Sequence, residues 1–251
     1  MDITVLVLTQ NSEATLERTL KSLTPFGSVI VVDGGSKDKT QEICRAHGAE
    51  FISNPFKGFS DQRNFALSKC ESEWAFFVDS DEEVTEELAD HLNSITGGEL
   101  YGVYRTEYFN GLEIKEGFGG NCYQQRFFRA DLFHYVGKVH EHPVRVDGKP
   151  FETLFIDKKY RLHHNPNNDL ELMVKKLGSY STLMAKDKIS RGRKTPLLTV
   201  FFAFNWYSIK YCIKNRKSGH RGFILAFLEG VNKALIYLYL YENKNKSGEV
   251  S

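Results

Sequence analysis

Four carboxylates stand together directly after an apolar run in the first half of the chain. The run Trp74–Val78 has the composition of a buried strand, and Asp79, Asp81, Glu82 and Glu83 follow it. Ligands of parallel α/β sheets bind at this end of the strands. Carboxylates so close repel one another unless a cation or solvent lies between them. Mg²⁺ or Mn²⁺ is usually coordinated by one or two carboxylates together with phosphate oxygens. The pattern indicates a metal and diphosphate site, or else a solvated loop leading into the acidic first turn of a helix.

A second apolar run, at residues 28–32, also ends in an aspartate. Asp33 is followed by Gly34 and Gly35, which permit a tight turn and close approach of a ligand to the backbone. The Asp33 carboxylate can accept hydrogen bonds from a nucleobase N–H or a ribose hydroxyl there. An ordinary strand-to-helix turn capped by Asp38 fits the same residues. Because the glycines form neither G-x-G-x-x-G nor a Walker loop, the dinucleotide and ATP fingerprints are absent.

Two further groups have residue types suited to phosphate binding and to proton transfer. Lys57 or Arg63, near the start of an expected helix, could lie against phosphate, and a surface helix start of mixed charge fits equally. Glu141 stands between two histidines, where a carboxylate can act as a general base near a metal. This is not H-E-x-x-H, so zinc-protease chemistry is not supported. His163 begins a histidine pair that offers a metal or phosphate ligand, although most histidines are simply packed or solvated.

The elements that must position these residues alternate between strand and helix over the first hundred residues. We expect strands over residues 2–8, 28–32, 50–52 and 74–78, and helices over residues 11–23, 40–47, 59–70 and 85–95. This alternation of strands and helices predicts a mostly parallel sheet with helices on both faces. After Gly98 shorter strands joined by glycine-containing turns are expected, over residues 101–109, 112–115, 125–129 and 144–146, which predicts a mixed or antiparallel second half.

The last part of the chain is expected to be helical. Residues 170–186 have apolar residues at helical spacing, and residues 197–213 and 223–241 are aromatic-rich but interrupted by polar residues. Neither of the last two segments has an uninterrupted membrane-spanning length. With the basic loop between them they could lie on an anionic membrane face, pack on the rest of the protein, or form a homodimer. We therefore predict a catalytic domain over residues 1–190 and a C-terminal helical extension over residues 191–251.

Composition limits the classes of function. The chain has 251 residues, of which 41% are hydrophobic and 26% charged, as in a soluble globular protein. A net charge of +1 gives no electrostatic case for nucleic-acid binding. The four cysteines are widely spaced without a C-x-x-C pair, so reduced, cytosolic thiols are expected. The first residues lack the basic region and cleavage site of an export signal, which also favours a cytoplasmic location.

Seven short motifs follow one another in a fixed order. They are Leu6–Ser12, Val32–Thr40, Gly58–Ala66, Asp79–Glu82, Gln125–Arg129, Val139–Glu141 and Leu162–His163. Each motif is weak alone, but seven in this order are specific. Over residues 3–186 the chain resembles the family 2 inverting glycosyltransferases of GT-A fold, and within them the lipopolysaccharide core β-1,4-glucosyltransferase-like branch.

The resemblance implies a GT-A fold, with a mixed, mostly parallel central sheet between helices, and a nucleotide-sugar donor, with a UDP-sugar expected. The nucleotide-sugar-binding residues expected from the motifs and the resemblance together are Thr9, Asn11, Asp33, Gly35, Arg63, Asp79, Gln125 and Arg126. Asp33 would recognise uracil or a similar base, and Asp79 would contact ribose or metal-bound water. Gln125 and Arg126 would lie near the donor or the acceptor.

The resemblance also implies a metal and a base. Asp81 would ligate the Mg²⁺ or Mn²⁺ that bridges the diphosphate, His163 would help to hold that metal or the diphosphate, and Glu141 would be the catalytic base. Inversion by single displacement needs one base for the acceptor hydroxyl proton, while the metal neutralises the leaving diphosphate. No protonated acid is needed, unlike in the glycosidases with two carboxylates, and this agrees with a lone Glu141.

These expectations describe a hexosyltransferase that acts on a glycan or lipid-linked acceptor in lipopolysaccharide or cell-envelope biosynthesis, in the cytoplasm or on the cytoplasmic face of the inner membrane. A sugar-1-phosphate nucleotidyltransferase is an alternative. Those enzymes usually place a Gly-rich, Arg-containing loop after the first strand, where residues 9–13 contain no glycine. A non-catalytic glycan- or nucleotide-binding protein of the same fold is the other alternative, and the presence together of Asp33, Asp79, Asp81 and Glu141 argues against it.

Overall fold

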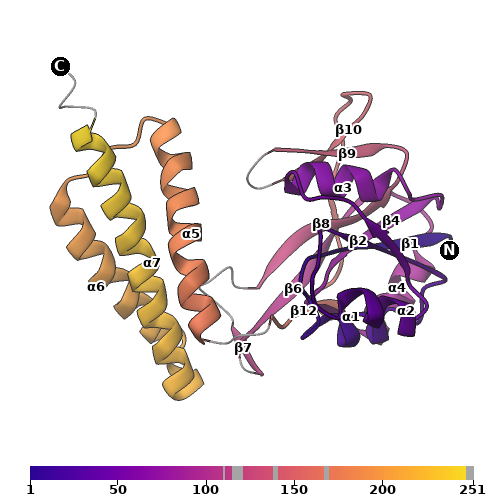
Figure 1. The fold of residues 1–251 in the computed structure, drawn as a ribbon, viewed down its shortest axis with the longest axis horizontal. Coiled ribbons are helices and arrows are strands. Elements are labelled where there is room, and N and C mark those ends of the chain that lie inside the picture. Colours follow the sequence, from indigo (N-terminus) through magenta and orange to yellow (C-terminus); the bar gives the residue numbers. More distant parts are fainter. Residues whose placement is uncertain (110, 115–120, 138–140, 167–169, 247–251) are drawn as a thin grey trace. The chain divides into compact units, whose positions relative to one another are not determined.

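The computed structural model describes residues 1–109, 111–114, 121–137, 141–166 and 170–246 (Figure 1). Their contacts divide the chain into two compact units. The first unit consists of Met1–Tyr108 with Asn121–Asn167, and we call it the sheet unit. The second consists of Phe109–Gly120 with Asn168–Ser251, and we call it the helical unit.

The first half of the sheet unit is parallel. Strands β1 (Ile3–Thr9), β2 (Ser28–Asp33), β3 (Glu50–Ser53) and β4 (Trp74–Asp79) lie in the order β3-β2-β1-β4, and all three pairings are parallel. The central two strands are buried on both faces, which explains their nearly continuous apolar sequences. The predicted parallel half of the sheet is confirmed.

The second half of the same sheet is mixed. Beyond β4 the order continues through β8 (Cys122–Arg129), β6 (Leu100–Phe109), β12 (Arg161–His164) and β5 (Glu82–Val84). The β4–β8, β8–β6 and β12–β5 pairs are antiparallel, and β6–β12 is parallel. The mixed character expected of this half is therefore confirmed, and β4–β8 is the junction between the two halves.

Several short strands complete the description. They are β7 (Leu112–Ile114), β9 (Phe133–Val136), β10 (His142–Arg145) and β11 (Leu154–Phe155). Strands β9 and β10 form a separate antiparallel pair, and β11 adds to β6. Glu141 lies between these two strands in the sequence and immediately precedes β10.

Helices cover both faces of the sheet, as predicted (Figure 1). They are α1 (Leu16–Ser22), α2 (Thr40–Ala46), α3 (Phe59–Leu67) and α4 (Glu86–Ser94). Side chains of α1, α2 and α4 share one hydrophobic cluster with Val5 and Val7 of β1, whereas Ala66 of α3 packs with Leu6 in a second cluster. Alternate residues of β1 thus point to opposite faces, each with its own core.

The first helix begins later than the sequence indicated. We expected a helix over residues 11–23, but α1 starts at Leu16 after Thr15. Asn11 instead has a φ of 52°, in the left-handed region that asparagine tolerates better than most residues. Its backbone and side chain are engaged by the loop after β2, so the segment before α1 forms part of the sheet edge.

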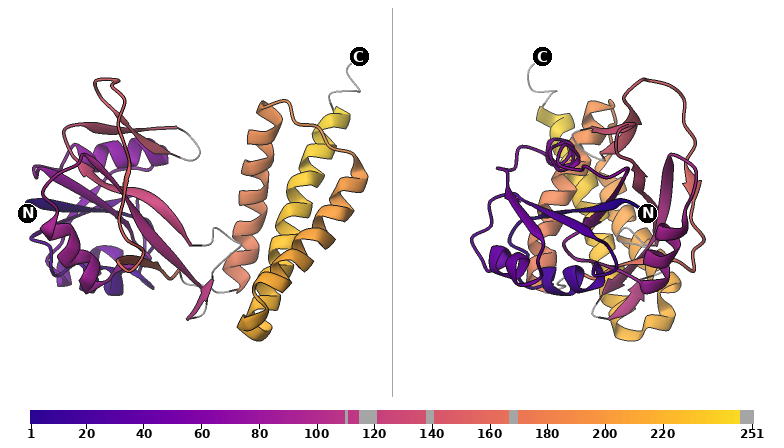
Figure 2. Two further views of the ribbon diagram at one scale, coloured as in Figure 1. Left: turned by 180° about the vertical axis from the view of Figure 1, so that it is seen from behind. Right: turned by 90° about the vertical axis from the view of Figure 1, so that its right-hand side faces the viewer.

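The helical unit contains three long helices that run side by side (Figure 2). They are α5 (Leu170–Ser190), α6 (Leu197–Lys214) and α7 (Gly219–Lys246), with a short 3-10 turn, Arg216–Ser218, before α7. Helix α7 contacts both α5 and α6. The sequence-based boundary at residue 190 placed α5 with the catalytic domain, whereas the contacts group α5 with the C-terminal helices.

The environment of the cysteines gives a first prediction. Cys44 is fully buried on α2, and burial together with the nearby charge of Asp33 raises the pKa of its thiol to about 11, whereas Cys212 on α6 is exposed. Because the thiolate is the reactive form, we expect iodoacetamide at about pH 8 to alkylate Cys212 and to spare Cys44 in the folded protein. Peptide mass mapping measures both. Equal labelling rates before unfolding would contradict the described packing of α2.

Candidate active site

The loops after β1 and β2 are fastened to each other by hydrogen bonds. The Asn11 backbone N–H donates to Ser36 Oγ at 2.7 Å, and Asn11 Oδ1 accepts from the Lys37 N–H at 2.9 Å. Further along, the Glu13 N–H donates to Asp38 Oδ2 at 3.0 Å. These contacts make the carboxyl ends of two neighbouring parallel strands into one preorganised edge, where ligands of such sheets bind.

Asp33 stabilises the turn that follows it. It is 2% exposed, and its Oδ2 accepts from the Gly35 and Ser36 N–H groups at 2.9 and 2.8 Å, while Ser36 Oγ donates to Oδ1. Gly35 has a φ of 107°, which a side chain would strain. Thr9 is next to this turn because its carbonyl accepts from the Gly34 N–H at 2.9 Å. The structure thus brings Thr9, Asn11, Asp33 and Gly35 together, and their roles in nucleotide binding stay predictions.

Asp79 lies at the end of β4 between two arginines. Arg126 binds it with two donors, Nη1 to Oδ1 at 3.0 Å and Nη2 to Oδ2 at 2.5 Å. Arg63 Nη2 adds a contact to Oδ1 at 3.2 Å. Burial alone would raise the pKa of Asp79, but Arg126 and then Arg63 hold that pKa well below its ordinary range. Both carboxylate oxygens are therefore engaged by the protein itself.

A bulge in β8 accounts for the position of Arg126. The β6–β8 register passes from Tyr101 opposite Phe127 to Gly102 opposite Gln125, which leaves Arg126 as the extra residue. Such bulges re-aim side chains next to active sites. Arg126 accordingly joins Asp79, whereas Gln125 donates to Thr153 Oγ1 at 2.8 Å and takes no recorded part in the charged cluster.

Arg63 joins the loop after β4 to Glu141. Its Nε donates to Glu141 Oε1 at 3.2 Å while its Nη2 contacts Asp79, also at 3.2 Å. The guanidinium carbon lies 5.3 Å from the ring centroids of both Phe77 and Tyr135, and the residue is 5% exposed. Arg63, predicted to lie against phosphate, therefore binds two carboxylates in this structure. His140, one of the two histidines that flank Glu141 in the sequence, lies outside the described residues.

Glu82 is a site residue that the sequence analysis missed. We interpreted it as part of a helix start, but it lies in β5, which pairs with β12, and it is completely buried. Its carboxylate accepts from the Asp79 N–H at 2.8 Å, Arg105 Nη1 at 3.2 Å and Arg126 Nη2 at 3.5 Å. Burial raises the pKa of Glu82. The backbone of the Asp79 loop is thus held by an acidic side chain three residues further along.

The histidine beside Asp81 is His164. Its Nε2 lies 3.3 Å from Asp81 Oδ2, and its Nδ1 lies 2.5 Å from Glu107 Oε2. Burial alone would lower the pKa of His164, but the hydrogen bonds to Asp81 and Glu107 raise it to about 10. His163, which we predicted as a ligand, has its ring centroid 5.1 Å from that of Tyr108. Successive residues of a strand face opposite sides, so the two histidines have different environments.

These residues fit a divalent cation. A histidine that ligates a metal usually donates its other ring N–H to a carboxylate, and Glu107 occupies that place beside His164. No group of three or more His, Cys, Asp or Glu side chains that could hold a metal occurs among the residues that the structure describes. Mg²⁺ and similar ions accept a site with two protein ligands in which diphosphate oxygens complete the coordination.

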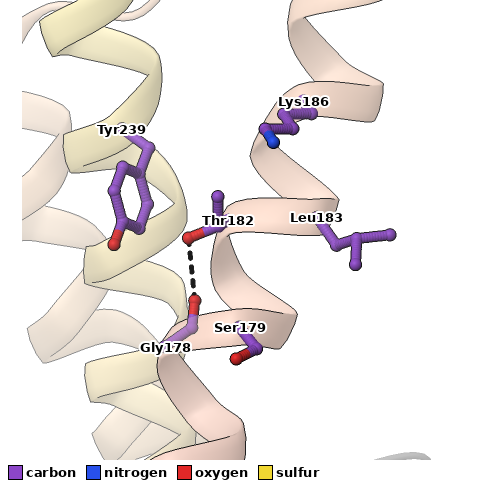
Figure 3. Close-up of a pocket in the computed structure, with 6 residues that line it drawn as sticks. All are labelled: Gly178, Ser179, Thr182, Leu183, Lys186 and Tyr239. Atoms are coloured by element: carbon purple, nitrogen blue, oxygen red, sulfur yellow. Dashed lines mark hydrogen bonds between the residues drawn. The ribbon is translucent and has the colours of Figure 1, made fainter.

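The charged cluster, not the most evident groove, marks the candidate site. A groove of about 530 Å³ lies in the helical unit, lined by side chains of α5 and by Tyr239 of α7 (Figure 3). It contains no carboxylate or histidine, and none of the predicted site residues lines it. Thr182, which Figure 3 shows near Tyr239, donates its hydroxyl to the Gly178 carbonyl within α5 at 2.8 Å.

Removing one arginine tests the charged cluster. Replacing buried Arg126 with methionine leaves Asp79 and Glu82 without their shared cation, so we expect a loss of about 3–5 kcal/mol in the free energy of unfolding. Arg129→Met in the same strand removes a more exposed contact with Glu73 and should cost about 1 kcal/mol or less. Urea unfolding measures both variants. Equal losses would show that the cluster does not carry this stability.

Comparison with known proteins identifies relatives of the chain. The family model described as glycosyl transferase family 2 matches residues 4–138, more than half of the chain. An uncharacterized glycosyltransferase of Rickettsia typhi, RT0209, is 28% identical over 221 residues, covering 83% of this chain and 75% of that protein. The lipopolysaccharide core biosynthesis glycosyltransferase LpsC of Rhizobium meliloti is 24% identical over 258 residues, covering 96% and 93%.

Among solved structures, glucosyl-3-phosphoglycerate synthase from Mycobacterium tuberculosis, in complex with Mn²⁺, UDP and glucosyl-3-phosphoglycerate, is 24% identical with a TM-score of 0.38. The match covers 41% of this chain and 44% of that one, less than half of either.

The match to the family model disfavours a nucleotidyltransferase. With a mixed, mostly parallel sheet between helices, the chain belongs to glycosyl transferase family 2 and has the GT-A fold.

Proposed function

We propose that this chain transfers a hexose from a nucleotide-sugar, with a UDP-sugar as donor, to a glycan or lipid-linked acceptor, with inversion at the anomeric carbon. The observation that carries the proposal is the single cation shared by Asp79 and Glu141. Arg63 holds the Glu141 carboxylate to the same sheet edge as the Asp79–Asp81 loop. A base for the acceptor hydroxyl thus lies next to the loop that would hold the donor diphosphate, as single displacement requires.

A divalent cation, when bound, would neutralise the charge that develops on the leaving diphosphate. In this proposal Asp81 and His164 hold it, and Glu107 orients the imidazole of His164. His164 replaces His163 as the proposed nitrogen ligand because its Nε2 already lies within 3.3 Å of Asp81. Arg63 and Arg126 then have a separate task, which is to fix the Asp79 carboxylate beside the donor.

The acceptor proposed here belongs to cell-envelope synthesis. The support is the similarity to LpsC, which extends over 96% of this chain. A glycan of the lipopolysaccharide core type is therefore the acceptor class that we propose, with the enzyme at the cytoplasmic side of the membrane. Nucleotide-sugar and acceptor would meet at the carboxyl ends of β1, β2 and β4, where the loops are already fastened together.

The base assignment predicts a separation of turnover from binding. Glu141→Gln keeps the shape of the side chain but cannot accept the hydroxyl proton, so we expect UDP release from UDP-glucose in the presence of a truncated lipopolysaccharide to fall about 10²–10⁴-fold. Stabilisation by UDP with Mn²⁺ should stay close to that of the unchanged protein. Glu71→Gln, at an exposed position, is the matched control. Unchanged turnover in Glu141→Gln would refute the assignment.

The metal assignment predicts a loss of linked binding. The unchanged protein with saturating UDP and Mn²⁺ should gain about 2–4 kcal/mol of stability, measured as a thermal shift that neither ligand gives alone. Asp81→Asn should lose most of this gain because an amide oxygen is a poor ligand in place of a carboxylate. Asp131→Asn, at a side chain that is 70% exposed, should keep it. An equal metal-dependent shift in Asp81→Asn would exclude Asp81 as a ligand.

A further inference from the structure

Helix α6 presents large apolar side chains outward. The residues that are more than half exposed there are Leu197, Leu198, Phe201, Phe202, Trp206, Ile209 and Ile213. Most recur every three or four residues, so they form one continuous stripe, which we call the α6 outer face. The first charged residue of α6 is Lys210, so three turns of this face contain no charge. An apolar stripe of this length is unusual on a protein surface that meets only water.

One cluster of polar residues of the same unit lies inside it. Glu229 of α7 is 4% exposed and accepts from Lys233 Nζ at 3.1 Å and from Asn232 Nδ2 at 3.3 Å. Asn232 Oδ1 in turn accepts from the hydroxyl of Ser181 on α5, which is completely buried, at 2.9 Å. The same unit also has an apolar core, in which Ala185, Ile236 and Leu240 are buried. The exposed apolar side chains of α6 are therefore additional to those that the core of the bundle uses.

Helix α6 packs closely on α7 through the face opposite its exposed stripe. A Cβ placed on Gly230 would lie 1.9 Å from Ser208 Oγ and 2.9 Å from the Phe204 carbonyl oxygen, so the two backbones approach closely. Ala226, one turn earlier on α7, is 1% exposed. Small residues four positions apart on α7 allow this approach, so α7 holds α6 firmly from behind its exposed face.

The charges around the α6 outer face have one sign. Residues 191–228 contain eight Lys and Arg residues and no Asp or Glu, although the whole chain has a net charge of only +1. Exposed basic residues stand at both ends of α6. Arg193 and Lys194 precede it, Lys214 is its last residue, and Arg216 and Lys217 follow it. A second copy docked on this face would bring like charges together. An anionic lipid headgroup layer is complementary at both ends.

We propose that the α6 outer face lies at the boundary between headgroups and acyl chains of an anionic lipid bilayer, with α6 parallel to the membrane plane. This orientation puts both basic ends of α6 against the same leaflet. Contrary to the expectation from the sequence, α7 has the length and hydropathy of a spanning helix over Gly219–Asn243, among the described residues. Its Glu229–Lys233 pair faces the bundle, however, so α7 serves as the support on which α6 is held.

Trp206 provides a direct test because the chain has two tryptophans and the other, Trp74, is 2% exposed in the sheet core. We expect Trp206 emission to shift to the blue on adding vesicles of phosphatidylcholine and phosphatidylglycerol in equal parts, but not with phosphatidylcholine alone. Nitroxide lipids labelled near the headgroup should quench it more than lipids labelled near the chain end. Trp206→Phe should still float with the vesicles without the shift.

Two variants with matched controls separate the apolar and the charged contributions. Phe201→Glu with Trp206→Glu should reduce vesicle flotation at least tenfold, whereas Val146→Glu, at a position 58% exposed in the sheet unit, should not. Replacing Lys214, Arg216 and Lys217 together by glutamine should weaken binding to the anionic vesicles about a hundredfold. The same change at exposed Arg45, Lys69 and Lys149 should have little effect. Circular dichroism checks that each variant is folded.

Three outcomes would overturn this proposal. The first is failure of the unchanged protein to bind the anionic vesicles. The second is strongest quenching by the deep nitroxide, which would mean that α6 spans the bilayer. The third is a lipid-free dimer, seen by light scattering, that Phe201→Glu with Trp206→Glu dissociates, because the face would then bind a second copy. None of these measurements uses a sugar nucleotide, so their failure is distinct from failure of the proposed transferase activity.

Discussion

Two buried arginines and a third that is 15% exposed hold the acidic residues of the candidate site together. Arg63 comes from α3, Arg105 from β6 and Arg126 from β8, and each pairs with at least two carboxylates. Charges removed from water are tolerated only when they are paired and hydrogen-bonded, and here each cation is shared between acids of different elements. The network therefore fixes the relative positions of the strand ends, and the loops that would bind a donor depend on it.

The site arises at the junction of the two halves of the sheet. The parallel half supplies the loops after β1, β2 and β4, which interlock through Asn11 and, by a 2.8 Å contact between hydroxyls, through Ser12 and Ser80. The mixed half supplies Arg105, Arg126 and the histidine beside Asp81. The bulge in β8 links the two halves because it directs the Arg126 guanidinium to Asp79 at the end of β4. Neither half would contain a complete site alone.

The helical unit follows a different physical rule from the sheet unit. In the sheet unit apolar side chains fill two cores, and the charged network lies at one edge. In the helical unit a polar cluster around Glu229 and an apolar core with Ile236 and Leu240 lie inside, and large apolar residues of α6 lie outside as well. These patterns suit two solvents, water for the first and a lipid interface for the second. A transferase with a lipid-linked acceptor would have a use for both.

The sequence alone determined the parallel half of the fold and the places where Asp33, Asp79 and Asp81 stand, because apolar strands and the residues that end them are local patterns. It could not identify Glu82 or choose between His163 and His164, since both depend on the pairing of β5 with β12. Strand alternation gives neighbouring histidines different surroundings, so the pairing decides which one meets Asp81. Arg63 shows the same limit. The sequence shows that it is charged, but only the fold shows that it forms ion pairs with Asp79 and Glu141.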